Sequence, residues 1–596
     1  MINIPVIPPQ FIFILGAIGV PFIKGRTKQL YLLSLPIIAF INLLYLQDGI
    51  QWTLRFLDYD LFVYVDKLSL AFAYIFTIMS FAAIIYALNE RNDGQYMAAL
   101  FYIGSALGVV LSGDLFSLLV FWEIMAISSL FLILYRGTKA SYKSGFRYLL
   151  MHAVGGSCLM AGIAIHVVNT GSIEFGFIGL NDVSSMLIFM GFIINAAIPP
   201  LHTWLTDAYP EATIAGTLFL SIYTTKTAVY VLARAFPGSE ILIILGTIMT
   251  VYPIFYAVIE NDTRRVLAYS LISQVGFMIV GIGIGTPLAL NGSVAHAFCN
   301  ILFEGLLFMC TGAILYVTGT SKYTELGGLY RSMPLTLIFC LIGAASISAF
   351  PFFNGFISKS MIIDAVMERD MLIIWLAMLF ASAGTIHYAG IKIPYFIFFA
   401  NDSGKRPNEP PINMLISMGL VAFLCIIIGI FPSIIYGILP YTVEFTPYTV
   451  EHILDQLQLI FFVAFGSLLL MTVGLYPPNQ RSVNLDVDWF YRKFAQLVIW
   501  FCEKPLLEFA TFLDRKSRDI GGSFLWFSAN PLNSIRIIKN LFHLMFVSTD
   551  DEMEIRIKLE KYKLKHLEKH EYMGISIGIL ALIIILVLYL LTTIIL

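Results

Sequence analysis

Apolar runs of roughly 18–24 residues, each long enough to cross a lipid bilayer as a helix, recur from one end of this sequence to the other. Of the 596 residues, 59% are hydrophobic and only 12% are charged, whereas a typical soluble domain has about 25% charged residues. The mean hydropathy is +0.84. Because backbone polar groups in lipid must find partners within the chain, the runs predict an all-α polytopic membrane protein.

The runs define sixteen candidate spans, and we expect about 14 transmembrane helices in the core. They lie at residues 6–23, 29–47, 66–88, 95–112, 114–134, 145–168, 185–207, 211–235, 238–258, 264–283, 292–317, 334–356, 371–399, 412–432, 452–475 and 573–595.

The charges between the spans predict the orientation. Three connections are basic, and they share one side of the membrane if the N-terminus is outside. The other side then holds the acidic, strand-like stretch 46–66 and the acidic loop 168–184. Positive loops mark the cytoplasm, so we expect both termini outside. The basic residues are Lys24, Arg26, Lys28, Arg136, Lys139, Lys143, Arg264 and Arg265.

Residues 476–572 combine mixed charge with repeated aromatic positions, as in "DWFYRKFAQLVIWFCEKPLLEFATFLDRKSRDIGG". The segment is too polar to span a membrane and too apolar for a disordered tail, which predicts an amphipathic helix on the cytoplasmic membrane surface. We expect Pro505, Gly521–Gly522 and Pro531 to interrupt it. At about 1.5 Å per residue it exceeds the width of one bundle, so it should reach neighbouring subunits.

Several classes of site are not expected. No glycine-rich phosphate loop follows a strand pattern, so no nucleotide site is expected. No redox cofactor motif is present either, so no cofactor is expected in this chain. No basic tract suits nucleic acid. The N-terminus lacks the basic start of a signal peptide, so the first run is interpreted as a retained helix. The cysteines form no CxxC pair and are interpreted as buried apolar residues; they are Cys158, Cys299, Cys310, Cys340, Cys425 and Cys502.

A polar stripe interrupts the apolar stretch "HAFCNILFEGLLF" at residues 296–308. His296, Asn300 and Glu304 are spaced four apart, so on a helix they lie one above another on a single face. A carboxyl group in a hydrocarbon-like setting is costly, which marks Glu304 as a candidate functional residue.

Four further charged residues lie inside apolar runs. Inserting such a charge costs about 2.5–3.5 kcal/mol, which favours a functional role. The alternative is structural: a neutral glutamate that fixes helix packing, or a lysine that extends its amine to the membrane surface. The residues are Glu123 in "LLVFWEIMAISSLFL", Lys226 in "LFLSIYTTKTAVYVLA", Lys359 in "FISKSMIIDAV" and Lys392 in "HYAGIKIPYFIFF".

Two runs should be broken. Pro199–Pro200 cannot continue a regular helix, and Pro351 with Gly355 interrupts the stretch 346–366. Asn195 and His202 flank the first break, where His202 lines an ion path or merely caps the freed backbone. Broken helices at membrane depth build ion sites, and one in each half of the chain indicates an internally repeated transporter architecture.

The embedded groups are dispersed along the chain, which argues against a metal site, whose ligands cluster. A nucleophile–base pair cannot be argued either. The pattern is better matched by a row of groups that pass protons through water within the bundle. In such a row, the charge of each group responds to the protonation of its neighbour.

Four motifs now point to a known family: "FWEIMA" (121–126), "PPLHTWLTDAYPEA" (199–212), "DTRRVLAYSLISQVGFM" (262–278) and "FPFFNGFISKSMI" (350–362). Over residues 60–435 the sequence resembles the antiporter-like subunits of respiratory complex I, the D-type subunit of Mrp-type multisubunit Na+/H+ antiporters, and hydrogenase membrane subunits. The C-terminal segment resembles that of the distal complex I subunit, whose lateral helix clamps its neighbours.

The resemblance implies two inverted five-helix repeats, with broken helices lining proton half-channels. It also implies roles for three residues. Glu123 stands where the family has its functional glutamate, Lys226 matches a lysine on the helix after the first break, and Lys359 matches the lysine of the "GFxSK" region.

The sequence departs from the family pattern at three positions. Many members have lysine in place of Asn195, which leaves Lys226 as the expected partner of Glu123. Many members also have His, His and Lys along the stripe, whereas here Asn300 replaces the second histidine and Glu304 replaces the lysine. Asparagine orients water but carries no extra proton, so the central relay is expected to be altered.

These interpretations divide the chain into six segments. They are the N-terminal helices 1–94, a first antiporter-like repeat 95–235, a second repeat 236–400, C-terminal core helices 401–475, a lateral amphipathic helix 476–572 and a transmembrane anchor 573–596.

We expect an ion-translocating subunit, for H+ or Na+/H+ antiport, of a multisubunit complex in a bacterial or archaeal cytoplasmic membrane, with other membrane subunits as partners. The complex is either a Mrp antiporter or a complex I-like redox pump. No catalytic site is expected in the chain itself, although such a complex can be an oxidoreductase. Two alternatives stay open: a structural subunit that has lost conduction, supported by Asn195, Asn300 and Glu304, and a stand-alone secondary transporter.

Overall fold

The computed structural model describes residues 7–400, 402–476, 479–480, 484–546 and 551–567. The chain forms two compact units, Met1–Asp486 and Val487–Leu596. The membrane anchor expected at 573–596 lies outside the described residues.

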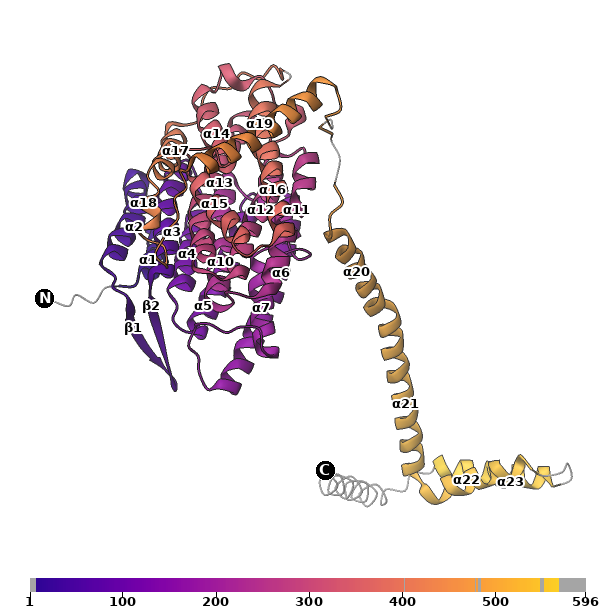
Figure 1. Ribbon diagram of the computed structural model, residues 1–596. Helices are drawn as coiled ribbons and strands as arrows, with labels where there is room; N and C mark the ends of the chain where they lie inside the picture. Colours follow the sequence, from indigo (N-terminus) through magenta and orange to yellow (C-terminus); the bar gives the residue numbers. More distant parts are fainter. Residues whose placement is uncertain (1–6, 401, 477–478, 481–483, 547–550, 568–596) are drawn as a thin grey trace. The chain divides into compact units, whose positions relative to one another are not determined.

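A β-hairpin follows the first two helices, as the strand-like stretch 46–66 indicates. Strands β1 and β2 pair antiparallel from Gly49 opposite Val65 to Phe56 opposite Tyr59, and they project from the end of the helical bundle (Figure 1). The elements are α1 (Pro9–Gly19), η1 (Val20–Phe22), α2 (Gly25–Tyr45), β1 (Gly49–Phe56) and β2 (Tyr59–Val65).

Most of the remaining helices of the first unit run side by side, and α19 crosses them obliquely (Figure 1). Those of the first half are α3 (Lys67–Ala87), α4 (Asp93–Leu111), α5 (Leu115–Leu134), α6 (Lys139–Thr170), α7 (Val183–Asn195), α8 (Thr203–Ala208), η2 (Tyr209–Glu211), α9 (Ile214–Ile222) and α10 (Thr224–Ala235). They continue as α11 (Glu240–Ile259), α12 (Thr263–Ile284), α13 (Pro287–Thr318), η3 (Tyr323–Glu325), η4 (Leu329–Arg331), α14 (Pro334–Ile347), α15 (Asn354–Met367), α16 (Leu372–Thr385), the π-helices η5 (Ile386–Lys392) and η6 (Tyr395–Phe399), α17 (Ile412–Ile430), α18 (Ser433–Tyr436) and α19 (Val450–Thr472).

Within the described residues, eleven helices are long and apolar enough to cross a membrane, and three shorter apolar helical stretches accompany them. The chain is therefore a polytopic α-helical membrane protein, as its apolar runs predict.

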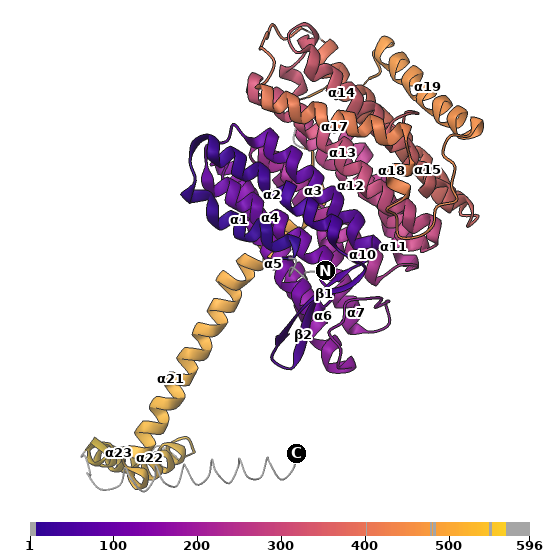
Figure 2. The ribbon, with the colours of Figure 1, turned by 90° about the vertical axis from the view of Figure 1, so that its left-hand side faces the viewer.

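Helices α12 and α13 lie in the middle of the bundle (Figure 2). The apolar, membrane-crossing stretch of α12 is entirely buried inside the bundle. Helix α11 packs against α12 through glycines, because a Cβ on Gly276 would lie 2.6 Å from the Thr250 nitrogen and one on Gly246 would lie 2.7 Å from the Val280 nitrogen. Small residues that let two backbones approach are a common way to hold helices together in membranes.

Both expected breaks are present. Helix α7 ends at Asn195 and α8 begins at Thr203, while α14 ends at Ile347 and α15 begins at Asn354. Each break leaves a short non-helical segment inside the first unit, so backbone groups are freed there for side chains to bind.

The expectation of one continuous span over 211–235 is wrong, because Tyr223 separates α9 from α10. The Thr224 nitrogen donates to the Tyr102 hydroxyl over 3.0 Å. A tyrosine from another helix thus takes the place of a backbone acceptor and stabilises a break that no proline or glycine marks.

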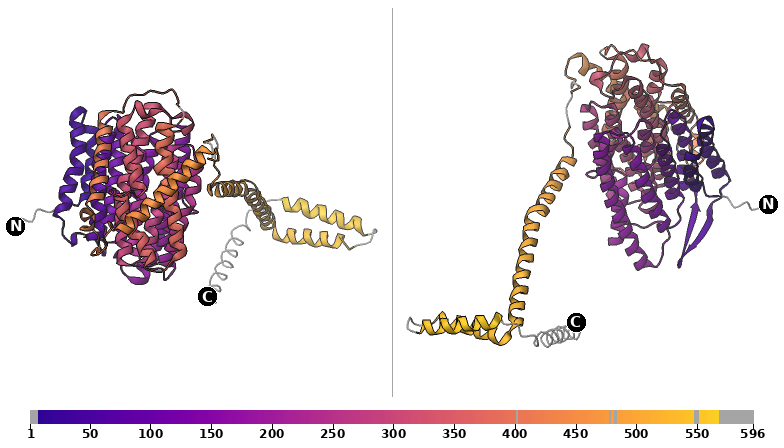
Figure 3. Two further views of the ribbon diagram at one scale, coloured as in Figure 1. Left: turned by 45° about the horizontal axis from the view of Figure 1, so that its top comes forward. Right: turned by 180° about the vertical axis from the view of Figure 1, so that it is seen from behind.

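The second unit contains α20 (Asp488–Phe501), the π-helix η7 (Cys502–Leu506), α21 (Leu507–Ala529), α22 (Pro531–Leu544) and α23 (Glu552–Leu567). Helices α22 and α23 lie side by side as an antiparallel pair (Figure 3). No residue of α20 or α21 is buried.

The interruptions expected in this segment are only partly present. Pro531 does begin a new helix, but Gly521–Gly522 lies inside α21 and Pro505 changes the winding to a π-turn without ending the helix. A glycine in a helix costs only about 1 kcal/mol relative to alanine, which does not end a long helix.

Candidate functional site

The polar stripe of the apolar stretch 296–308 lies on α13 and is buried. His296 and Asn300 are 0% exposed and Glu304 is 1% exposed. The Asn300 amide donates to Glu304 Oε2 over 2.6 Å. His296 lies 3.1 Å from Ser358 Oγ of α15 and 3.2 Å from Gln274 Oε1 of α12. The stripe therefore joins three helices by polar contacts.

Lys226 and Lys359 each lie at a helix break. Lys226 Nζ donates to the Ser221 carbonyl over 2.9 Å, across the break at Tyr223. Lys359 Nζ donates over 3.2 Å to the carbonyl of Ile347, the last residue of α14. Carbonyls at a helix end lack their intrahelical donors, and the partial negative charge there attracts a cation.

Lys392 binds a helix end in the same way. It lies on the π-helix η5 and donates to the Ala257, Val258 and Glu260 carbonyls at the end of α11, over 3.1, 2.7 and 2.7 Å. Its amine also lies 5.0 Å from the centre of the Tyr323 ring. All three embedded lysines thus combine a buried charge with a backbone contact.

Glu304 interacts with one lysine from each half of the chain. Its carboxylate interacts electrostatically with Lys226 and, more weakly, with Lys359. Both lysines also act on His296. The structure therefore brings these four predicted residues together around α13.

Glu123 lies apart from this group. It is half-buried on α5, with its carboxylate against Gly156 of α6: a Cβ on that glycine would lie 1.8 Å from Glu123 Oε1. The expected pairing of Glu123 with Lys226 is not present, because Lys226 contacts Ser221 and interacts with Glu304 instead.

Asn195 has a partner that the sequence interpretation missed. Its Oδ1 lies 2.9 Å from Nδ1 of His152, a buried residue of α6. The His152 ring lies between Tyr148 and Trp204, with centroid distances of 4.1 and 4.7 Å. The sequence signal is a histidine inside an apolar run, one turn before Gly156, the glycine against Glu123.

His202 is bound by residues from distant parts of the chain. Its Nε2 lies 3.2 Å from Asp486 Oδ2, the same oxygen that accepts from the Tyr269 hydroxyl over 2.8 Å. Asp486 Oδ1 accepts from the Tyr252 hydroxyl over 2.5 Å. His202 is thus not a simple cap for the first break, and Asp486 is a second residue that sequence reasoning missed.

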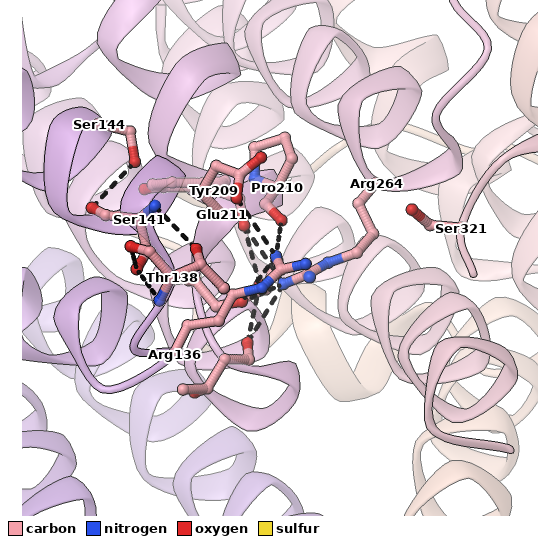
Figure 4. Close-up of polar contacts among 12 residues, drawn as sticks. Arg136, Thr138, Ser141, Ser144, Tyr209, Pro210, Glu211, Arg264 and Ser321 are labelled. Atoms are coloured by element: carbon pink, nitrogen blue, oxygen red, sulfur yellow. Dashed lines mark hydrogen bonds and ion pairs between the residues drawn. The ribbon is translucent and has the colours of Figure 1, made fainter. Parts of the chain in front are cut away.

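Two arginines bind the turn after α8 (Figure 4). Arg264 donates to the Tyr209, Ala212 and Thr213 carbonyls over 3.3, 2.9 and 3.2 Å. Arg136 donates to the Pro210 carbonyl. The sequence predicts only that the two residues belong to basic loops, whereas Arg264 is 2% exposed and its hydrogen bonds stabilise the chain between α8 and α9.

Buried polar atoms without a protein partner also gather along these helices. Buried polar groups of this kind are usually satisfied by ordered water. Among the described residues, they include His152 Nε2, Asn195 Nδ2, His202 Nδ1, Thr227 Oγ1, Asn300 Oδ1 and Glu304 Oε1. No three His, Cys, Asp or Glu side chains in the described part of the chain lie close enough to hold a metal ion.

The chain combines broken membrane helices with buried, charged side chains. This combination is typical of multi-helix membrane subunits that carry titratable groups at membrane depth. Residues 112–385 match the family described as "NADH:quinone oxidoreductase/Mrp antiporter, TM". Over this segment the chain is similar to that family of antiporter-like membrane subunits.

Curated relatives are named as Na+/H+ antiporter subunits of type A, whereas the sequence motifs resemble the D-type subunit. The A-type subunit of Alkalihalophilus pseudofirmus is 29% identical over 571 residues, which cover 82% of this chain and 70% of the relative. The A1-type subunit of Staphylococcus aureus is 27% identical over 593 residues, which cover 87% and 73%.

Solved structures with a similar fold are membrane complexes. The Mrp complex of Dietzia sp. DQ12-45-1b matches with a TM-score of 0.74 and 22% identity, over 91% of this chain but only 63% of that one. An archaeal membrane-bound sulfane sulfur reductase matches with 0.68 and 21%, over 91% and 99%. Respiratory complex I of Thermus thermophilus matches with 0.62 and 20%, over 72% and 98%.

Proposed function

We propose that this chain is a proton-translocating subunit of a multisubunit complex in the cytoplasmic membrane of a bacterium or archaeon. The observation that carries the proposal is the position of Glu304, whose buried carboxylate interacts with Lys226 of the first half and Lys359 of the second. Opposite charges away from water interact strongly, so a change of protonation at one group alters the others.

A branch of polar contacts supports a route from this centre. His296 contacts Gln274, whose amide donates to Thr385 Oγ1 over 3.2 Å, and that hydroxyl lies 3.3 Å from the Tyr388 hydroxyl. Tyr388 belongs to the π-helix η5, which also carries Lys392. Local π-helices are frequent at functional sites, and hydroxyl and amide groups can order the water that passes protons.

Exchange of Na+ for H+ is the activity that we propose for the complete complex. Its support is the name of the curated relatives, whose alignment covers most of this chain. A redox-driven pump is the second candidate, supported by the fold likeness to the sulfane sulfur reductase and complex I.

Vesicles that contain the complete complex test both candidates. For an antiporter, adding Na+ to acid-loaded vesicles collapses the pH gradient without an electron donor. For a redox pump, Na+ has no such effect and an electron donor builds the gradient. If an assembled complex gives neither of these responses, the result contradicts the proposal.

Conduction by this chain is tested by Glu304→Gln and Glu123→Gln in the same vesicles. We expect each to slow ion exchange at least tenfold, a change equivalent to about 1.4 kcal/mol. Glu240→Gln, at an exposed acid in the first turn of α11, is the matched control and should leave exchange unchanged. Unchanged transport in both site variants would favour a structural subunit, and a purified single chain that transports alone would favour a stand-alone transporter.

A further inference from the structure

Three consecutive residues before α20, Asn484, Leu485 and Asp486, form a short strap over α11 and α12. Asn484 Nδ2 donates to Glu260 Oε2 over 3.1 Å, and the Leu485 carbonyl accepts from the Tyr256 hydroxyl over 3.2 Å. Asp486 follows with its contacts to His202, Tyr252 and Tyr269. Every residue of the strap thus has a polar contact with the helical bundle of the first unit.

The Asp486 carboxylate is bound by groups from three different elements. His202 precedes α8, Tyr252 lies on α11 and Tyr269 lies on α12. Asp486 is 7% exposed and His202 is 0% exposed. A carboxylate that accepts three hydrogen bonds is held firmly, and its direction is fixed by them.

The carboxylate also determines which nitrogen of His202 carries the hydrogen. Because an ionised carboxylate only accepts hydrogen bonds, it favours the tautomer with hydrogen on Nε2. Nδ1 is then the free acceptor, and it is a buried atom without a partner among the described residues. His202 therefore offers a basic nitrogen at the first helix break.

We propose that Asp486 is a positioning residue for proton transfer at His202, and that the strap makes this transfer depend on the segment leading into α20. The proposal rests on the proposed proton translocation and adds a residue to it. A proton from water binds Nδ1, and the resulting cation faces the Asp486 carboxylate. Release of the proton from Nδ1 to water restores the starting tautomer.

The strap also contacts the second half of the chain. Glu260, which binds Asn484 through its carboxylate, gives its backbone carbonyl to Lys392. Displacing the strap would therefore affect His202 and the end of α11 near Lys392 together. This arrangement gives the segment before α20 a means to influence both halves.

The test compares Asp486→Asn with Asp486→Glu in vesicles of the complete complex. The amide can donate to Nε2 and so favours the wrong tautomer, and we expect ion exchange to fall about tenfold or more. Asp486→Glu keeps the charge and should restore part of the rate, which a purely structural contact would not predict. Asp519→Asn, at an exposed position of α21, is the matched control with an unchanged rate.

A double variant separates this mechanism from general damage. If Asp486 acts through His202, then His202→Gln with Asp486→Asn is no slower than His202→Gln alone. If Asp486→Asn fails to assemble, Tyr269→Phe carries the test, because it removes one bond to the carboxylate and keeps the charge. The inference is overturned if the fold losses in rate of the two single variants multiply in the double variant, or if Asp486→Asn leaves the rate unchanged. A wild-type complex without ion transport would instead overturn the proposed function itself.

Discussion

The Asn300 side-chain amide donates to the Glu304 carboxylate one turn along α13, over 2.6 Å. The bond leaves Asn300 Oδ1 and Glu304 Oε1 as buried acceptors without a described partner. The middle position of the stripe therefore holds the acid in place instead of carrying a proton. The two residues that depart from the family pattern, Asn300 and Glu304, are thus joined by a hydrogen bond.

The sign of the charge at Glu304 should matter. Glu304→Lys places a third positive charge near Lys226 and Lys359, and like charges away from water repel strongly. We expect ion exchange in vesicles to fall at least tenfold, equivalent to about 1.4 kcal/mol. The exchanged pair Glu304→Lys with Lys226→Glu should recover part of the rate, because it restores opposite charges.

The controls for this experiment are Glu240→Lys, at an exposed position of α11, and the amount of assembled complex. An undiminished rate in Glu304→Lys would mean that the sign of the charge is irrelevant and that the interaction with the lysines does not serve transport.

The membrane fold and the two breaks could be predicted because their signals are local. Apolar length predicts a span, and Pro199–Pro200 forces a break wherever the helix lies. The break at Tyr223 has no such signal, because it depends on the hydroxyl of Tyr102, more than one hundred residues earlier in the chain. The uninterrupted α21 shows the opposite case, where two adjacent glycines are tolerated.

The candidate site could be predicted only in part for a related reason. A charge in an apolar run, such as Lys359, is visible in sequence, but its contact with the Ile347 carbonyl depends on how the chain returns after the break. His152 and Asp486 were missed because a histidine inside an apolar run carries no specific signal and Asp486 lies in a polar segment. Only the folded chain brings them to Asn195 and His202.

The N-terminal cap of α7 should make stability depend on pH. Hydrogen bonds from the Ser185 backbone and from the Ser184 hydroxyl lower the pKa of Asp182 from 3.8 to about 2. A carboxyl whose pKa is lower in the folded protein contributes stability above its unfolded pKa and loses it as the pH falls through the folded value. We therefore expect Asp182→Ala to lower the melting temperature at neutral pH.

The difference in melting temperature between the wild type and Asp182→Ala should narrow as the pH falls from about 4 to about 2, the interval set by the two pKa values. Thermal unfolding in mild detergent measures it. Asp182→Asn, which keeps an oxygen acceptor for the cap, should retain most of the stability at neutral pH. A difference that stays constant over this interval would contradict the role of the charged carboxylate.

Arg264 should be needed for stability because its guanidinium binds three carbonyls at once (Figure 4). All three bonds come from one guanidinium nitrogen. Arg264→Met removes this donor but keeps a long side chain, so it should lower the free energy of unfolding by about 2–3 kcal/mol. Thermal unfolding of the purified chain measures the loss. Arg331→Met, at an exposed arginine, should change stability by less than about 0.5 kcal/mol.

Gly156→Ala should disturb transport without changing any charge. The new Cβ would lie 1.8 Å from Glu123 Oε1, and this flexible carboxylate can move aside more easily than a helix can. We therefore expect nearly normal stability, with ion exchange reduced about as much as in Glu123→Gln. Gly466→Ala in α19 is the matched control, because a Cβ there meets nothing within 4 Å. If Gly156→Ala transports normally while Glu123→Gln does not, then transport requires the charge of the Glu123 carboxylate but not its position against α6.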